Sequence, residues 1–77
     1  MMRAYAVVVE QADGNLSAYV PDLPGCITVG DSLEEIAHNI QEAIDLYLED
    51  LIEDGQSIPE PTTVAIMASP SNLQEVA

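Results

Sequence analysis

Hydrophobic side chains follow a two-residue period early in the chain and a helical period later. Residues 5–10 are rich in β-branched residues and almost entirely apolar, which predicts a central strand buried on both faces. Asp13-Gly14-Asn15 is a strong turn signal, and residues 16–20 alternate apolar and polar side chains as the second strand of a hairpin. A short third strand over residues 26–29 completes an antiparallel meander.

A rigid turn is expected between the second and third strands, in Val20-Pro21-Asp22-Leu23-Pro24-Gly25-Cys26. Both prolines fix φ and remove a backbone N–H donor, and each pushes the residue before it into an extended conformation. Gly25 permits backbone angles that other residues avoid. Cys26 has no basic neighbour in the sequence and is expected to be a small buried hydrophobe.

Residues 32–54 predict one long amphipathic helix. Ser32 and Glu35 match a capping box at its start, and Gly55 stands where a left-handed C-cap belongs. Apolar residues recur every three or four positions, so they form one stripe that faces the sheet. The stripe comprises Leu33, Ile36, Ala37, Ile40, Ala43, Ile44, Tyr47, Leu48, Leu51 and Ile52.

A fourth strand is predicted over residues 62–67, which are β-branched and apolar, and a loose polar tail begins at Ala68. The order β-β-β-α-β, with one helix on one face of a small sheet, is an α+β fold. We therefore expect one domain over residues 1–67 and a polar C-terminal tail over residues 68–77.

Length and cysteine content limit the kind of protein. The 77 residues suffice for one small domain, which is marginally stable alone, so oligomerisation to a dimer or tetramer is expected. A single cysteine allows no internal disulfide, which favours a cytoplasmic location. The longest apolar run is too short to span a membrane.

Charge narrows the possible partners. One Lys or Arg against fourteen Asp and Glu gives a net charge of −13, so no direct nucleic-acid binding by this chain is expected. Nine of the acids lie within residues 31–54, several as like-charge pairs four residues apart that each cost about 0.2–0.5 kcal/mol. This helix face is either a solvated surface that confers solubility or a surface for a basic partner, and the uncompensated repulsion favours the partner.

The unbroken run over residues 18–32, Ala-Tyr-Val-Pro-Asp-Leu-Pro-Gly-Cys-Ile-Thr-Val-Gly-Asp-Ser, closely resembles the HicB-like antitoxin family, together with residues 5–10 and 42–48. The resemblance covers residues 4 to about 67 and implies a partial ribonuclease-H-like fold. It also implies a partner, because HicB-like proteins neutralise HicA-like toxins, which are small basic ribonucleases. We therefore expect an antitoxin that binds and occludes such a toxin, and not an enzyme.

Candidate toxin contacts lie on the proline-rich turn and on the acidic side of the helix. They are Asp22, Leu23, Pro24, Glu35, Glu42, Asp45 and Glu49. Leu23 is either an apolar anchor on a rigid turn or a side chain that packs back against the sheet. No cofactor or metal is expected, and the lone His38 is expected at the surface.

Two further possibilities concern nucleic acids. A metal-dependent nuclease needs several carboxylates, which Glu10, Asp22, Asp31 and Glu35 could supply, but no basic surface would hold its substrate. Many family members carry a C-terminal DNA-binding domain. These 77 residues contain no such domain, so operon autoregulation by this chain alone is not expected.

The alternative function is a stand-alone homo-oligomeric interaction or regulatory module with no toxin partner. Its expected interface is the sheet face opposite the helix, through Tyr5, Val7 and Val9. An edge strand of the sheet is the second possible interface.

Overall fold

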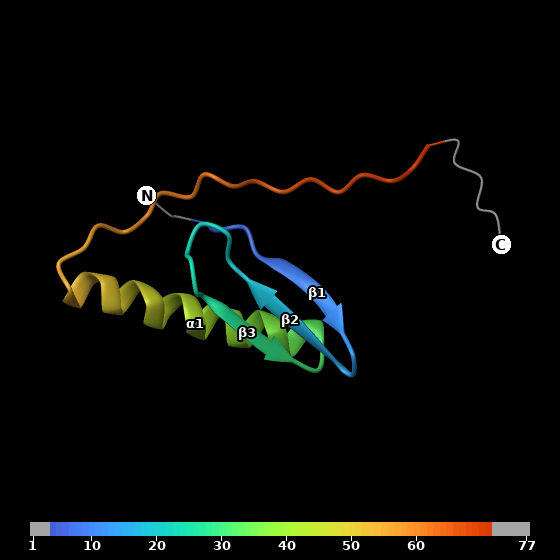
Figure 1. Cartoon of the computed structure of the whole chain (residues 1–77), viewed down its shortest axis with the longest axis horizontal. Coiled ribbons are helices and arrows are strands. Elements are labelled where there is room, and N and C mark those ends of the chain that lie inside the picture. Colours follow the sequence, from blue (N-terminus) through green and yellow to red (C-terminus); the bar gives the residue numbers. More distant parts are fainter. Residues whose placement is uncertain (1–3, 72–77) are drawn as a thin grey trace.

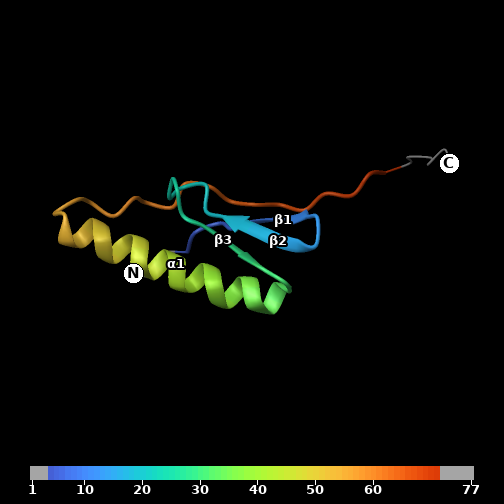
Figure 2. The ribbon, with the colours of Figure 1, turned by 60° about the horizontal axis from the view of Figure 1, so that its bottom comes forward.

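The computed structural model describes residues 4–71 as a three-stranded sheet covered on one face by one helix (Figure 1). Strands β1 (Val8–Ala12), β2 (Asn15–Tyr19) and β3 (Ile27–Gly30) are antiparallel neighbours in the order β1-β2-β3, and helix α1 spans Leu33–Glu53. In Figure 2 the sheet lies between α1 and the chain that follows it. The α+β fold expected from the sequence, a meander followed by one long helix, is confirmed.

The proline-rich turn between β2 and β3 is part of the core. Its backbone closes on itself, because the N–H of Val20 donates to the carbonyl of Cys26 at 3.1 Å and the N–H of Cys26 donates to the carbonyl of Leu23 at 3.0 Å. The turn buries Leu23 completely, and Val20 and Cys26 are also buried. They pack with Ala18 of β2 and with the two buried residues of α1, Ile36 and Ile40.

Both ends of α1 follow the expected capping rules. The Ser32 hydroxyl accepts the N–H of Glu35 at 3.1 Å, which satisfies one of the free donors of the first turn. At the other end, Gly55 has a φ of +71°, and its N–H and that of Gln56 donate to the carbonyls of Ile52 and Leu51. This is a Schellman motif, and it ends the helix where the glycine allows the chain to reverse.

The prediction that residues 5–10 form a central strand buried on both faces is wrong. β1 begins at Val8, pairs only with β2, and is exposed over most of its length. The central strand is β2, because it pairs with β1 on one side and with β3 on the other. Tyr5 and Val7 precede β1 and are half-buried against the helix side of the core.

The prediction of a fourth strand over residues 62–67 is also wrong for the single chain. The structure has no strand after α1 within residues 4–71, and the chain there is extended and largely exposed. Its first residues are held by hydrogen bonds to the proline-rich turn instead of by a strand edge. Most of the polar tail expected over residues 68–77 lies outside the described residues.

Candidate functional site

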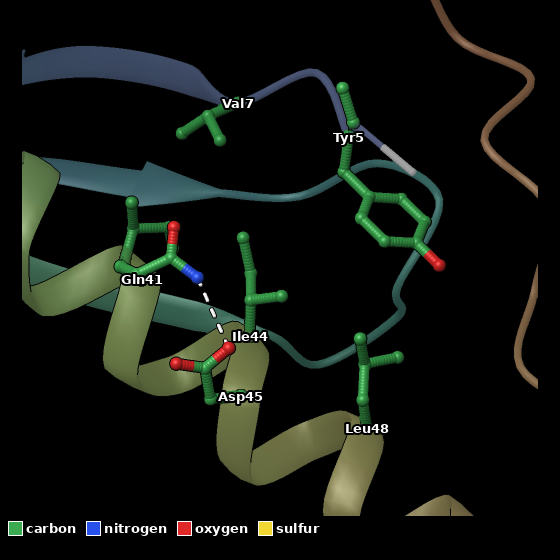
Figure 3. A pocket seen from close by; sticks show the side chains of 8 residues that line it. Tyr5, Val7, Gln41, Ile44, Asp45 and Leu48 are labelled. Atoms are coloured by element: carbon green, nitrogen blue, oxygen red, sulfur yellow. Dashed lines mark hydrogen bonds between the residues drawn. The ribbon is translucent and has the colours of Figure 1, made fainter. Parts of the chain in front are cut away.

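The side of α1 that faces away from the sheet carries a run of acids, which we call the acidic face. Its sequence-predicted members are Glu35, Glu42, Asp45 and Glu49, which at 3.6 residues per turn fall within an arc of about 80°. Glu53, five turns after Glu35, is exposed within the same arc. All four predicted side chains are exposed. Glu35, Glu42 and Glu49 lie opposite the buried side of the helix, and Asp45 lies at the edge of the face, where it also lines the pocket beside Tyr5 and Val7 (Figure 3). The sequence-predicted helix candidates therefore share one surface.

Two of these acids have hydrogen-bond partners on the helix or at its start. Oε1 of Glu35 accepts the backbone N–H of Asp31 at 3.4 Å, one residue before the position a capping box uses. Oδ1 of Asp45 accepts Nε2 of Gln41 at 3.1 Å. Neither partner is charged, so both carboxylates keep their negative charge available to a partner.

Glu42 and Glu49 complete the acidic face. Oε1 of Glu42 lies 2.9 Å from Nε2 of His38, and both side chains are mostly exposed. This confirms the expected surface position of His38. An exposed pair of this kind contributes little to stability. The Glu49 carboxylate has no hydrogen-bond or ion-pair partner within the described residues.

His38, beside Glu42, is the only basic side chain near the acidic face within the described residues. Residues 4–71 contain no Lys or Arg, because the one such residue in the chain is Arg3. The face therefore presents uncompensated negative charge to solvent, on a rigid helix of 21 residues. A surface of this kind attracts basic partners and repels nucleic acid.

Asp22, on the proline-rich turn, uses both carboxylate oxygens within the chain. Its Oδ2 accepts the backbone N–H groups of Thr62 and Thr63, each at 2.9 Å, and its Oδ1 accepts their hydroxyls at 3.0 and 2.8 Å. These bonds, led by that from the Thr63 N–H, lower the pKa of Asp22 from 3.8 to about 2. We call this arrangement the latch, since it fastens the chain after α1 to the turn.

The other turn candidates divide between the core and the surface. Leu23 is 0 % exposed, so it packs back against the sheet, as the second of its two interpretations predicts. Pro24 is exposed at the tip of the turn. Figure 2 shows the turn in the sheet layer and α1 in the other layer, so the structure separates the seven candidates into two groups.

Tyr5, Val7 and Val9 do not lie on the sheet face opposite the helix, contrary to the prediction. Tyr5 and Val7 pack against the core and line a pocket with Ile44 of α1 (Figure 3). Val9 pairs with Ala18, whose side chain is buried under the helix, so Val9 points to the same side. The strand period of two places them on the helix side because residues 5, 7 and 9 alternate with Val8.

The sheet face opposite the helix also carries apolar side chains. The pairing of Val8 with Tyr19 and of Tyr19 with Ile27 places these three side chains in one row across the sheet. Ile27 and Val29 are both more than half exposed. This face is therefore partly uncovered, although its residues differ from those predicted.

A second tether holds the chain after α1 near the N-terminal segment. The Tyr5 hydroxyl donates to the carbonyl of Pro59 at 2.6 Å. Sequence reasoning missed this bond and the roles of Thr62 and Thr63. The Thr-Thr pair is a reasonable donor set for a carboxylate, but its acceptor is 40 residues away and no local pattern reveals it.

The arrangement does not assemble a catalytic centre from the candidate carboxylates. Within residues 4–71, no three His, Cys, Asp or Glu side chains group so as to hold a metal ion. Asp22 is engaged in the latch and Glu35 in the helix start. Cys26 is buried, as predicted, and burial raises the pKa of its thiol, which disfavours the reactive thiolate.

Helix α1 is the only helix in the described part of the chain, and it is not apolar enough to cross a bilayer. Its polar side is the acidic face described above.

Known proteins resemble this chain over most of its length. Residues 5–77 match the family described as HicB_like antitoxin of bacterial toxin-antitoxin system. UPF0150 protein ssr1765 of Synechocystis sp. is 46 % identical over 57 residues, which are 73 % of this chain and 72 % of that protein. An uncharacterized 14.9 kDa protein of Haemophilus phage HP1 is 33 % identical over 78 % of this chain, but the match spans only 45 % of the phage protein.

The fold is also found in a solved structure. A chain in the HicA3 and HicB3 toxin-antitoxin complex superimposes with a TM-score of 0.68 and 27 % sequence identity. The match covers 78 % of this chain and 70 % of that chain. Sequence and fold therefore point to the same group of proteins.

Proposed function

The chain belongs to the HicB-like antitoxins of bacterial toxin–antitoxin systems, and on that premise we propose that it neutralises a small basic HicA-like ribonuclease by binding it directly. Membership of an antitoxin family indicates a binding role and not catalysis. In this proposal the chain covers the surface on which the toxin holds RNA. The toxin is then inactive because its substrate is excluded.

The observation that carries this proposal is the acidic face. Four exposed carboxylates on one side of a rigid helix, without Lys or Arg within residues 4–71, resemble the charge pattern of a nucleic-acid backbone. A ribonuclease that binds RNA phosphates through Lys and Arg offers a complementary surface. Such complementarity raises the rate of association and selects against acidic partners.

The turn contributes less to this contact than the helix. Leu23 is buried and Asp22 is held in the latch, so Pro24 is the turn candidate whose side chain is exposed. We therefore assign toxin binding to the acidic face first. Pro24 is a secondary contact, which an interface larger than one helix face would include.

The proposal is tested by neutralising three acids of the face together: Glu42→Gln, Asp45→Asn and Glu49→Gln. The probe is the product of any small basic HicA-like reading frame found beside this gene, with binding measured by calorimetry and neutralisation measured as rescue of growth. We expect binding to weaken at least about tenfold, because several charge pairs at an interface each contribute to affinity. Rescue is lost in parallel.

A matched control separates the acidic face from total charge. The variant Glu10→Gln, Asp13→Asn removes charges from exposed positions around the β1–β2 loop, away from α1. It should retain affinity within about threefold, since distant exposed charges act mainly on the association rate. An equal loss per charge removed in the two variants, or no loss in the first, would reject the acidic face as the binding site.

A stand-alone oligomeric module is the second candidate function, and uncovered apolar surface favours it. Ile27 and Val29 on the open sheet face are exposed, as are Val64 and Ile66 after the helix. A stable oligomer in a genome without an adjacent toxin gene would support this function over the first. A monomer that binds the toxin would reject it.

A further inference from the structure

The chain after α1 contains a strand-like stretch that contacts little of its own molecule. Val64 and Ile66 are each 87 % exposed, and Met67 is 98 % exposed. The stretch is extended and runs apart from the sheet in Figure 1. Exposed β-branched side chains on an extended backbone are suited to pairing with a strand.

The free side of β1 offers a matching edge. Only β2 pairs with β1 among the strands of residues 4–71, so the other edge of β1 keeps backbone donors and acceptors available. An apolar groove lies beside this edge on the helix side. The groove is lined by Val7, Val9, Leu33, Ile36, Ala37 and Ile40.

Two tethers position the strand-like stretch without pairing it to its own β1. The Tyr5 hydroxyl holds the Pro59 carbonyl, and the latch holds Thr62 and Thr63 against the turn. Beyond Thr63 the chain leads away from these contacts (Figures 1 and 2). The same chain therefore has an unpaired edge and an unpaired strand-like stretch.

The lack of charged side chains at this surface favours a second copy of this chain over a basic partner as its occupant. Residues 61–70 contain no charged side chain, and every residue that lines the groove is apolar. A basic partner gains no electrostatic attraction there. Two chains with a net charge of −13 repel each other, and they approach at lowest cost through surfaces that lack acids.

We propose that residues 64–67 of one chain add as a fourth strand to the β1 edge of a second copy, which returns the same contact. Val64 and Ile66, which share one side of an extended chain, enter the groove of the partner, and the backbone pairs with β1. The contact is reciprocal, so it closes as a two-fold dimer and leaves no free edge for further addition. The acidic faces stay outside this interface.

Cross-linking between two single-cysteine variants tests the pairing. Gln11→Cys lies on the exposed β1, and Ala65→Cys lies in the strand-like stretch, while the native Cys26 is buried. The two full-length proteins are mixed and treated with a short bis-maleimide that tolerates a shift in register. We expect a covalent dimer between Gln11→Cys and Ala65→Cys chains, identified by mass spectrometry. Glu49→Cys mixed with Ala65→Cys is the control and should give none.

The outcomes decide between the arrangements. A covalent dimer of Ala65→Cys with itself, without the mixed product, would reject the proposal in favour of pairing between two strand-like stretches. A chain that is monomeric by light scattering at high concentration would also reject it, and would leave the toxin as the occupant of the β1 edge.

A substitution provides an independent measurement. Ile66→Lys places a charge in the apolar groove and should raise the dissociation constant of the dimer at least about tenfold. Leu46→Lys, at an exposed apolar position of α1, is the matched control and should leave the dimer intact. Because Ile66→Lys keeps the acidic face, its toxin binding should persist. Loss of toxin binding without loss of the dimer would contradict the assignment of residue 66 to the dimer.

Discussion

Helix α1 separates two β-rich stretches that reach opposite degrees of burial. In the stretch around β2, Ala18 and Val20 are each 2 % exposed, whereas Val64 and Ile66 after the helix are almost fully exposed. β2 pairs with a strand on each side. A two-residue loop connects it to β1, and the proline-rich turn connects it to β3. Within residues 4–71, the hydrogen bonds that hold the later stretch lie at or before its start, where Tyr5 and Asp22 bind it. The difference shows that pairing and burial depend on a neighbouring strand, while β-propensity alone sets an extended backbone.

The largest effect should come from the core of the proline-rich turn. Leu23→Ala removes a side chain that is 0 % exposed, so the free energy of unfolding should fall by about 3 kcal/mol. Urea denaturation followed by circular dichroism measures it. The same truncation after the helix, Ile66→Ala, should change the stability of the monomer by less than about 0.5 kcal/mol, since its side chain lies in solvent. Similar losses in both variants would contradict the contrast between the two stretches.

A smaller effect is expected at the boundary between the two regions. Gly55 has a φ of +71°, which strains any other residue except asparagine, so Gly55→Ala should destabilise the chain by about 1 kcal/mol. Thermal denaturation measures the loss, and Gly55→Asn should recover part of it. Ser57→Ala, two residues further on and exposed, is the control and should be neutral. An unchanged melting temperature in Gly55→Ala would show that the helix ends differently in solution.

Lowering the pH should have the smallest effect on the stability of the sheet and helix. Its main effect should be to release the later stretch from the proline-rich turn. Because the pKa of Asp22 is lowered from 3.8 to about 2, the latch contributes stability above pH 3.8 and loses it as the pH falls through about 2. The amide signals of Thr62 and Thr63 should therefore titrate near pH 2 in an NMR experiment. Asp22→Asn should abolish that titration and increase the amide exchange of Thr62 and Thr63, whose N–H groups the Asp22 carboxylate accepts.

A second variant tests this prediction at a milder pH, in case the chain begins to unfold near pH 2. Thr63→Val removes the hydroxyl hydrogen bond to Oδ1, so the pKa of Asp22 should rise toward 3.8 and its titration can be followed in the folded protein. A midpoint near 3.8 in the native chain would indicate that the latch is open in solution.

Local signals sufficed for much of the fold. The turn at Gly14, the cap at Ser32 and the stop at Gly55 are each dictated by a few adjacent residues, and the structure has all three. The face of α1 that packs on the sheet follows from its helical period. These features depend on interactions within one turn or one hairpin, which a single sequence contains.

Features that depend on distant partners could not be read in the same way. β1 has the composition of a central strand but lies at the edge, because its position follows from the order of the meander. The acidic face was predictable from spacing along one helix. The engagement of Asp22 was not, because Thr62 and Thr63 lie 40 and 41 residues away. The position of the turn candidates was therefore harder to predict from the sequence than that of the candidates on α1.

The separation of these residues along the chain also sets an order of folding. The strands of the meander and α1 join neighbours in sequence, and contacts of this kind form rapidly. The latch and the Tyr5–Pro59 bond close loops of 40 or more residues, at a larger cost in chain entropy. During synthesis, therefore, the helix with its acids is complete before the last residues are fastened. Under the two proposals above, the residues that would contact a toxin are therefore ordered earlier than the residues that would contact a second copy.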